Sequence, residues 1–457
     1  MGAGDRASSV QRGGGSRSGA ARKGPAPLYK RLPHGPHRLD RREVALNQRA
    51  RIHGAMIEAV ARSGYEATSV KQVIGLAGVS RRSFYEHFAN REACFLATFD
   101  VIAGRGIRRV ARAYLAAGGD LEERLGAAFA ELGAIERADP KAAALVAWEA
   151  QGAGEAALAR LRSATCACEQ LLARGFGEAR EAGPLPTPIA GGLQGIITRS
   201  IRPRGEAPGE ELAATLLAWT LSFRGTGVTH VAERMRATAA RRLAAGALGA
   251  AASSRERTAP APEAARILAS VLRLAATGAY GELTELQIAE EAGVPLQALL
   301  ALHPDRDACF LAALEMLGEQ LLATVAAGAR DREDWAQGVR SALGALLGHL
   351  AASPLCAATI SASAFAAGSA PLGRNLEIAE ALARRLTAGS PDGPPPAAVI
   401  EGIAGAIWHT VGCQVAAGRR GLLPLLSDHL AFVVLAPCVG ADGAAEALAR
   451  EPGRPSG

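Results

Sequence analysis

Apolar residues recur every three or four positions along most of this chain, which is the spacing of amphipathic helices. A long helix is predicted from about 39–42 to Ser63, where Gly64 ends it; its inner face carries Val44, Ile52, Met56, Ile57 and Val60. The composition agrees, because the chain is rich in Ala and only 4% aromatic, which favours helix over sheet. We therefore expect an all-α protein.

A short helix is predicted directly after this long one. Ser69 and Gln72 have the spacing of a capping box, so the helix should start at Val70. Gly78 should end it, because glycine tolerates the left-handed conformation of a tight turn. A second short helix follows, and two short helices around a glycine-containing turn make a helix-turn-helix.

The second short helix is predicted to present an unusual polar face. Ser80 can cap it, and Phe84 and Phe88 share one face that should pack inward. The outward residues are then Arg81, Arg82, Ser83, Tyr85 and His87. Arginine can bond in a bidentate manner to guanine or to phosphate, and hydroxyl groups suit phosphate oxygens. Arg91 begins the next helix and is expected to hold the phosphate backbone.

The two halves of the chain resemble each other. A shift of 215 positions aligns residues 51–97 with residues 266–312 without a gap, and 14 of the 47 positions are identical. The match continues at shifts of 214 and 210, as in Gly154/Gly368 and Gly195/Gly405. We therefore predict two similar all-helical domains in tandem.

The second copy keeps the turn of the helix-turn-helix but loses its polar face. Pro295 stands where Ser80 does, and the five outward residues become Leu296, Gln297, Ala298, Leu300 and Leu302. With Leu299, these leucines are expected to form an apolar surface that packs against protein. The second copy is thus predicted to be a degenerate head that no longer binds DNA.

Charge separates the two halves in the same way. The net charge is +7, with +7 in residues 1–45, +6 in residues 46–250 and −6 in residues 251–457. The first half is therefore the one expected to meet a polyanion. Residues 28–42 form a basic, Pro-containing arm that can follow a DNA groove, with a solubilising tail as the equal alternative.

The first helix-turn-helix resembles the TetR-type transcriptional repressors. The residues that carry the resemblance are Gly64-Tyr65, Thr68-Ser69-Val70, Ala77-Gly78-Val79-Ser80, Phe84-Tyr85, His87-Phe88 and Arg91-Glu92, after the lead-in 47–52. The resemblance implies about nine helices, a dimer, an N-terminal DNA-binding head and a ligand-sensing body. It places DNA contacts at Thr68, Ser69, Ser80, Arg81, Arg82, Ser83, Tyr85, His87 and Arg91.

This resemblance leads to a full set of expected domains. They are a disordered basic arm (1–38), a helix-turn-helix domain (39–100), an effector and dimerisation body (101–248), a linker (249–262), a degenerate helix-turn-helix (263–317) and a second helical body (318–450). An apolar effector pocket is expected in the bodies. Its candidate lining residues, for most of which core packing is the stronger expectation, are Phe129, Trp148, Glu149, Gln151, Trp219, Phe223, His230, Trp335, His349, Phe365, Trp408 and His409.

The expected function is that of a cytoplasmic DNA-binding transcriptional regulator, a repressor released by a small molecule. No catalytic motif is present in context, so we expect no enzyme and no cofactor. Seven cysteines include only the pair Cys166 and Cys168, interpreted as reduced thiols rather than metal ligands. No apolar run long enough to span a bilayer is expected.

Several alternatives stay open at this stage. The chain can be an all-helical ligand carrier or enzyme with a vestigial head, or an interaction module, although the intact polar face of the first helix-turn-helix argues against both. The two halves can pair within one chain as an internal pseudo-dimer, or two chains can form a homodimer.

Overall fold

The computed structural model describes residues 41–176, 185–201, 211–225, 237, 262–277, 280–330, 334–363 and 367–450. The arm at 1–38 and all of the linker except Pro262 lie outside the described residues. Every regular element within them is helical, which confirms the all-α fold.

The helices of the first half begin with the three of the helix-turn-helix. They are α1 (Arg41–Ala67), α2 (Val70–Ala77), α3 (Arg81–His87), α4 (Arg91–Ala116), α5 (Leu121–Ala138), α6 (Pro140–Ala144), the π-helical turn η1 (Leu145–Glu149), α7 (Ala150–Gly152), α8 (Glu155–Gly175), α9 (Pro186–Ile201) and α10 (Glu211–Leu221). A backbone kink at Gly64, with φ of 74°, ends the straight part of α1 where the sequence predicts it.

The second half follows the same order. Its helices are α12 (Glu263–Thr277), η2 (Tyr280–Glu282), α13 (Glu285–Ala292), α14 (Leu296–Leu302), α15 (Arg306–Ala329), α16 (Trp335–Ala352), α17 (Pro354–Ala358), the π-helical turn η3 (Thr359–Ser363), α19 (Ser369–Thr387), α20 (Ala397–Ala416), η4 (Arg420–Leu426) and α21 (Ser427–Ala449). Both π-helical turns stand at the same place, before the helix whose N-cap is Gly154 or Gly368.

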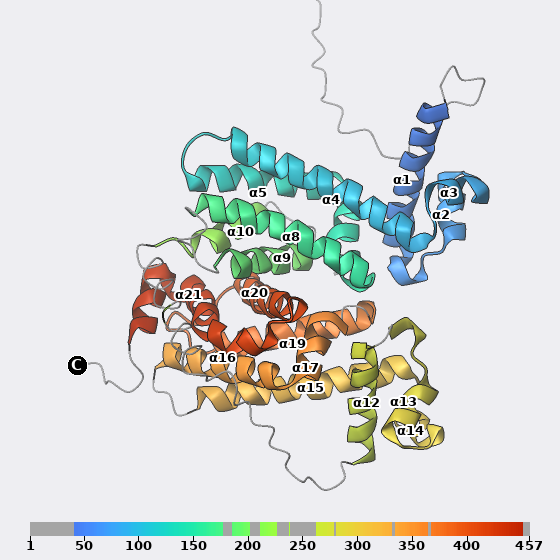
Figure 1. The fold of residues 1–457 in the computed structure, drawn as a ribbon. Coiled ribbons are helices and arrows are strands. Elements are labelled where there is room, and N and C mark those ends of the chain that lie inside the picture. The colour runs from blue at the N-terminus through green and yellow to red at the C-terminus, as the bar shows by residue number, and fades with distance from the viewer. Residues whose placement is uncertain are drawn as a thin grey trace, which may run out of the picture.

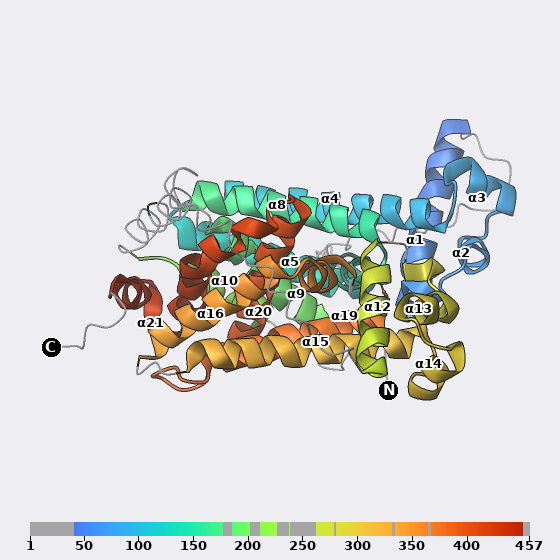
Figure 2. The same ribbon diagram turned by 60° about the horizontal axis from the view of Figure 1, so that its bottom comes forward.

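The two helix-turn-helix units lie at the same end of the molecule (Figures 1 and 2). We call residues 41–100 the first head and residues 263–317 the second head. The bodies, residues 101–221 and 318–449, pack against each other at the other end. The expected boundaries at 100/101 and 317/318 fall inside the continuous helices α4 and α15, so each head is joined to its body by a helix rather than by a loop.

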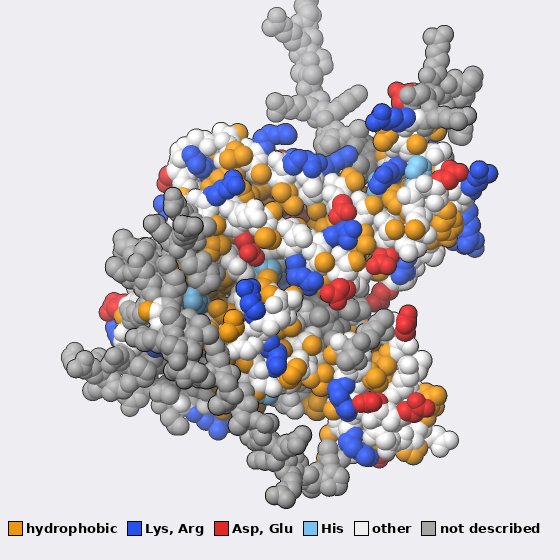
Figure 3. All heavy atoms as spheres, in the orientation of Figure 1, with side chains coloured by type: hydrophobic (Ala, Val, Ile, Leu, Met, Phe, Trp, Pro, Cys, Tyr) orange, Lys and Arg blue, Asp and Glu red, His pale blue; other side chains and the backbone are white. Residues whose placement is uncertain are grey.

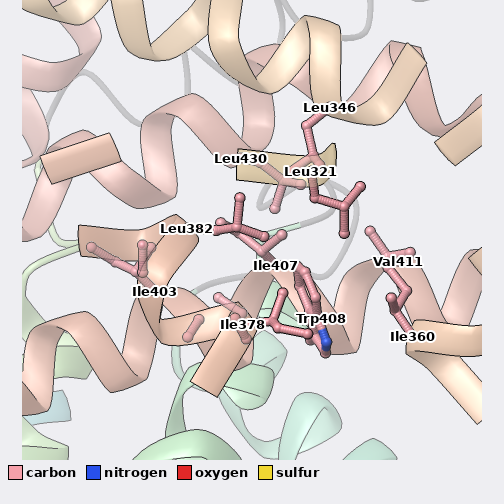
Figure 4. Close-up of a cluster of buried hydrophobic side chains, with 14 of the residues drawn as sticks. Leu321, Leu346, Ile360, Ile378, Leu382, Ile403, Ile407, Trp408, Val411 and Leu430 are labelled. Atoms are coloured by element: carbon pink, nitrogen blue, oxygen red, sulfur yellow. The ribbon is translucent and has the colours of Figure 1, made fainter. Parts of the chain in front are cut away.

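The hydrophobic core joins the two bodies. Figure 4 shows part of it, where Trp408 and Ile407 from α20 meet Leu321 from α15, Leu346 from α16 and Leu382 from α19. Buried side chains of the second head belong to this same core. The first head instead shares a separate core with η1 and the start of α8. The two heads are therefore anchored to different cores.

The two bodies meet most closely where α9 lies along α20, and we call this contact the glycine seam. A Cβ atom on Gly405 would stand 2.5 Å from the backbone oxygen of Gly191 and 2.9 Å from the Cα of Gly195. A Cβ on Gly195 would stand 2.6 Å from the backbone oxygen of Glu401. Two helix backbones thus touch directly, which only glycine allows.

Among the described residues, two helices are long and apolar enough to cross a membrane by length and composition, Arg306–Ala329 and Arg420–Ala449. A bent pair, Trp335–Ala352 with Pro354–Ser361, passes the same test if it is counted as one span. The expectation that no apolar run reaches this length is therefore corrected. The apolar windows of the two helices are 44% and 56% buried inside the protein. Their apolar character is explained in part by a position in the protein core.

The glycine seam generates a stability prediction. Gly405→Ala should lower the free energy of unfolding by about 1–3 kcal/mol, because the added methyl group meets backbone atoms that cannot rotate away. On the same helix, a Cβ on Gly412 would meet only Ser361 Cβ at 3.8 Å, an ordinary contact. Gly412→Ala should therefore leave stability unchanged or raise it by about 0.5–1 kcal/mol. Urea unfolding of both variants compares them, and equal destabilisation would contradict the seam.

Candidate DNA-binding surface and the cavity between the bodies

Local capping places α2 as the sequence predicts. The Ser69 hydroxyl accepts the Gln72 N–H at 3.3 Å, and the Gln72 side-chain oxygen accepts the Ser69 N–H at 2.6 Å. Gly78 closes the helix with φ of 61°, in the left-handed region. The Ser69 side chain is exposed at the start of α2.

Helix α3 buries its phenylalanines and exposes its cations. The Ser80 hydroxyl accepts the Ser83 N–H at 3.0 Å and so starts the helix. Phe84 and Phe88 are buried, as predicted. Arg81, Arg82 and Tyr85 are exposed, with the Arg81 guanidinium 5.8 Å from the centre of the Tyr85 ring.

Two residues expected on the outer face turn back toward α1 instead. The Ser83 hydroxyl donates to the Gln48 side-chain oxygen at 2.9 Å, and His87 Nε2 lies 3.3 Å from the same oxygen. Both side chains are half-buried. Because Gln48 lies on α1, these contacts set the angle between α3 and the long helix, and they leave a smaller outward face than the sequence predicts.

Thr68 and Arg91 are also used inside the head. Thr68 is 1% exposed, and its hydroxyl donates to the Gly64 carbonyl at 2.7 Å. Arg91 Nη1 donates to the carbonyls of Glu66 and Thr68 at 2.9 and 2.8 Å, and its guanidinium stacks 4.5 Å from the centre of the Tyr65 ring. These contacts lock the turn between α1 and α2, so we expect both residues to position the head rather than contact DNA.

The second head repeats the contacts of Arg91. Arg306 Nη1 donates to the carbonyls of Gly281 and Leu283 at 3.1 and 2.9 Å, and its guanidinium stacks 5.0 Å from the centre of the Tyr280 ring. The second head has no basic face on α14, yet this arginine has the same geometry there. Arg91 and Arg306 therefore share a structural role.

Lys71 is a cation of the first head that the sequence analysis missed. It is exposed on α2, beside the N-cap Ser69. The aligned residue of the second head is Leu286, which is 52% exposed. The difference between Lys71 and Leu286 is of the same kind as the differences between α3 and α14, where most polar side chains of the first head align with apolar ones of the second. The alignment of the two halves already contains this signal.

The face of α14 is apolar where that of α3 is basic. Pro295 makes no side-chain cap, and Leu300 and Leu302 are 44% and 51% exposed. Leu299, expected on this surface, is instead fully buried, because it occupies the inward position that Phe84 holds in the first head. In Figure 3, Lys and Arg side chains stand at the outer edge of the first head, whereas basic, acidic and hydrophobic side chains are mixed over the second.

A comparison with protein families identifies the first head. Residues 55–98 match the family model described as "Bacterial regulatory proteins, tetR family". The first head is therefore similar to the N-terminal domain of tetR-family regulators. The matched residues run from the middle of α1 into α4 and include the whole helix-turn-helix.

Solved structures similar to this chain include TetR-family proteins. A putative TetR-family transcriptional regulator from Syntrophomonas wolfei is 19% identical, over 38% of this chain and 92% of its own, with a TM-score of 0.33. FadR from Bacillus subtilis, in complex with stearoyl-CoA, is 17% identical over 38% of this chain and 98% of its own, with a TM-score of 0.34. A putative transcriptional regulator from Pseudomonas aeruginosa is 23% identical, over 40% of this chain and 90% of its own, with a TM-score of 0.33. No curated protein matches the chain.

A cavity of about 130 Å³ lies along the glycine seam, away from the TetR-family head. Both bodies line it: Trp148, Gln151, Gln194 and Thr198 come from the first, and Glu401, Trp408 and His409 from the second. Four of these residues were predicted from the sequence to line a pocket: Trp148, Gln151, Trp408 and His409. They were expected in two separate pockets, one in each half, whereas the structure has them in one cavity. Phe129, Trp219 and Phe223 pack in the core instead, and His230 and Phe365 lie outside the described residues.

Charged groups form one side of this cavity. Arg199 of α9 pairs with Glu380 of α19, and its Nε lies 3.4 Å from a carboxylate oxygen of Glu401. Burial raises the pKa of Glu401 to about 7, although Arg199 opposes the rise. Trp148 and Gln151 also line the cavity, and the side-chain nitrogen of Gln151 donates to the Thr198 hydroxyl at 3.0 Å.

One short segment connects the cavity to the TetR-family head. Trp148 lines the cavity from the π-helical turn η1. The next residue, Glu149, accepts the backbone N–H of Tyr65 at 2.9 Å, directly after the Gly64 kink. Burial raises the pKa of Glu149, the Tyr65 hydrogen bond lowers it, and nearby Glu66 raises it. The segment η1 thus contacts both the cavity and the turn before α2.

The shared geometry of Arg91 and Arg306 leads to a matched prediction. Arg91→Ala and Arg306→Ala should each lower stability by about 1–3 kcal/mol, because each removes hydrogen bonds to backbone carbonyls. If Arg91 only positions the head, Arg91→Ala leaves the slope of log K against log salt for DNA binding unchanged. Loss of about 0.9 from that slope in Arg91→Ala alone would show a phosphate contact.

Proposed function

We propose that this protein is a transcriptional repressor that binds double-stranded DNA through its first head and is released by a small molecule. The observation that carries the proposal is the exposed group Lys71, Arg81, Arg82 and Tyr85 in a head of the TetR family. Arginines at the start of a recognition helix can read guanine edges, and the lysine suits a phosphate. The exposed caps Ser69 and Ser80 complete the proposed contact surface.

We further propose that the chain is a duplicated protein whose halves form an internal pseudo-dimer with one working head. The equivalent order of helices in the two halves and the packing of α9 along α20 support this arrangement. The apolar residues Leu286, Leu300 and Leu302 in the second head support the loss of its DNA contacts. One chain then covers one half-site, and a palindromic operator needs two chains, spaced by helical turns of about 10 bp.

The proposed effector site is the cavity between the bodies. Its size limits the buried part of the effector to about one aromatic ring, since an engineered cavity of about 150 Å³ in another protein admits benzene. Trp148 and Trp408 offer apolar contact, and Gln151 and Gln194 offer hydrogen bonds. A ligand that displaces Trp148 shifts η1, and so favours a different position of the first head.

The alternative of an enzyme or ligand carrier with a vestigial head is less well supported. The exposed Arg81 and Arg82 on a capped helix support a working head, and the uncharged residues at the aligned positions of the second head supply the contrast. A cytoplasmic location follows from the proposed partner, because DNA-binding regulators act where the chromosome lies.

DNA binding by the first head is tested with a duplex selected from a randomised pool by the full-length protein. Arg81→Ala with Arg82→Ala should abolish specific binding, since an arginine that reads a base contributes about 1–3 kcal/mol. Lys71→Ala should flatten the salt slope by about 0.9. The matched control is Gln297→Ala, at the position of Arg82 in the second head, and it should bind like the parent. Unchanged binding by the double variant would refute the assignment.

The link from η1 to the head is tested by amide hydrogen exchange. Glu149→Ala removes the acceptor of the Tyr65 N–H, so the Tyr65 amide should exchange faster, and operator affinity should fall because the head is less well positioned. Glu149→Gln keeps a side-chain oxygen and should retain most of the protection. Identical exchange of Tyr65 in the parent and in Glu149→Ala would mean that this bond does not hold the head.

A further inference from the structure

Three potential metal-binding side chains converge at the end of the cavity between the bodies. Glu169 comes from α8, and His409 and Cys413 stand one helical turn apart on α20. Their ligand atoms all lie within 4.8 Å of one another. His409 Nε2 lies 3.0 Å from Glu169 Oε1 and 3.5 Å from Cys413 Sγ. The three side chains are half-buried, and two of them line the cavity.

The arrangement is not that of a nucleophile activated by a base. In such a relay the carboxylate holds one ring nitrogen of the histidine and the thiol meets the other. Here the carboxylate and the thiol both approach the same nitrogen, Nε2 of His409. The ligand atoms of Glu169, His409 and Cys413 instead converge on one point, which is the arrangement of a cation-binding site.

The spacing of the donors fits a tetrahedral metal ion. Ligands at the usual Zn–N, Zn–O and Zn–S distances of about 2.0–2.3 Å lie about 3.3–3.7 Å apart at the tetrahedral angle. The 3.5 Å from nitrogen to sulfur falls in this range, and the 3.0 Å from nitrogen to oxygen requires a small rotation of Glu169. A carboxylate, an imidazole and a thiolate are all ligands that Zn²⁺ accepts.

A neighbouring hydroxyl orients the carboxylate. The Thr187 hydroxyl donates to Glu169 Oε2 at 3.1 Å, which directs the other oxygen, Oε1, to His409. Hydrogen bonds to the far side of a ligand are usual around metal centres and fix the ligand orientation. Tight packing also fixes the histidine, because a Cβ on Gly191 would stand 2.5 Å from His409 Cβ.

The electrostatics of the cluster favour positive charge at Nε2. Burial lowers the pKa of His409, but Cys413 and Glu169 outweigh it and raise the pKa to about 9. A metal ion binds the imidazole, the carboxylate and the thiolate in their deprotonated forms, so its binding releases any protons that these groups carry.

We propose that Glu169, His409 and Cys413 form a binding site for Zn²⁺, or a divalent ion of similar softness, that ties α8 of the first body to α20 of the second. The fourth coordination position faces the cavity, where water or a small-molecule donor completes the shell. The site does not depend on the proposed regulatory function, and it is tested without DNA.

The test is a titration of the reduced, metal-free, full-length protein with Zn²⁺ against a chromophoric chelator. The expected result is one ion per chain, with proton release on binding and an apparent affinity that rises from pH 6 to pH 8. Substitution by Co²⁺ should give thiolate-to-metal charge-transfer absorption that Cys413→Ser abolishes. Circular dichroism confirms that each variant keeps its helices.

Matched variants locate the ion. Cys413→Ser and His409→Gln should each weaken binding by about tenfold or more, and Thr187→Val by about 10–100-fold through the orientation of Glu169. Cys166→Ser with Cys168→Ser, next to Glu169 on α8, should bind like the parent. The proposal is overturned if the parent protein binds Zn²⁺ no more tightly than Cys413→Ser does. It is also overturned if the Cys166/Cys168 variant is the one variant that loses Zn²⁺ binding.

Discussion

The direct contact of two helix backbones at the glycine seam is the constraint on which the rest of the molecule depends. Gly191 and Gly195 of α9 and Gly405 of α20 leave no room for a single methyl group. This approach lets both bodies contribute walls to one cavity and brings Glu169 within reach of His409. A wider spacing of the helices would separate both sites into half-sites that bind little.

A comparison of the two heads separates the residues that stabilise the domain from the residues that serve another purpose. The capping boxes Ser69/Gln72 and Thr284/Gln287 are both kept, as are the stacked pairs Arg91/Tyr65 and Arg306/Tyr280. The exposed positions of α3 change to alanine, glutamine and leucine in α14. Residues retained in the head without a basic face have a structural reason to be there, and the contacts of Arg91 within the first head match those of Arg306.

Local structure was largely predictable from the sequence because short-range chemistry determines it. A capping box, a left-handed glycine and an i,i+4 pair of phenylalanines involve residues within a few positions of one another, and the helix-turn-helix followed from them. The side-chain roles were less predictable. Ser83 and His87 face Gln48, 35 and 39 positions away, and nothing in the pattern of α3 reveals that partner.

Long-range sites were beyond sequence reasoning for the same reason. Glu169 and His409 are 240 positions apart, and the spacing of the neighbouring Cys166 and Cys168 does not indicate a partner for Glu169. Only the packing of α8 and α9 against α20 brings these side chains together. The alignment of the halves predicted similar domains but could not show that the cavity lies between them.

The glycine seam joins two parts of a single polypeptide, and this has a consequence for how its assembly responds to dilution. Two separate subunits dissociate as their concentration falls, so their apparent stability depends on protein abundance. When the two parts are joined in one chain, the association is intramolecular, and its effective concentration is set by the linker and not by the abundance of the protein. The α9–α20 contact therefore persists at a few molecules per cell, and it cannot exchange partners with related chains. Each half is also free to accumulate substitutions that a symmetric pair would have to tolerate twice.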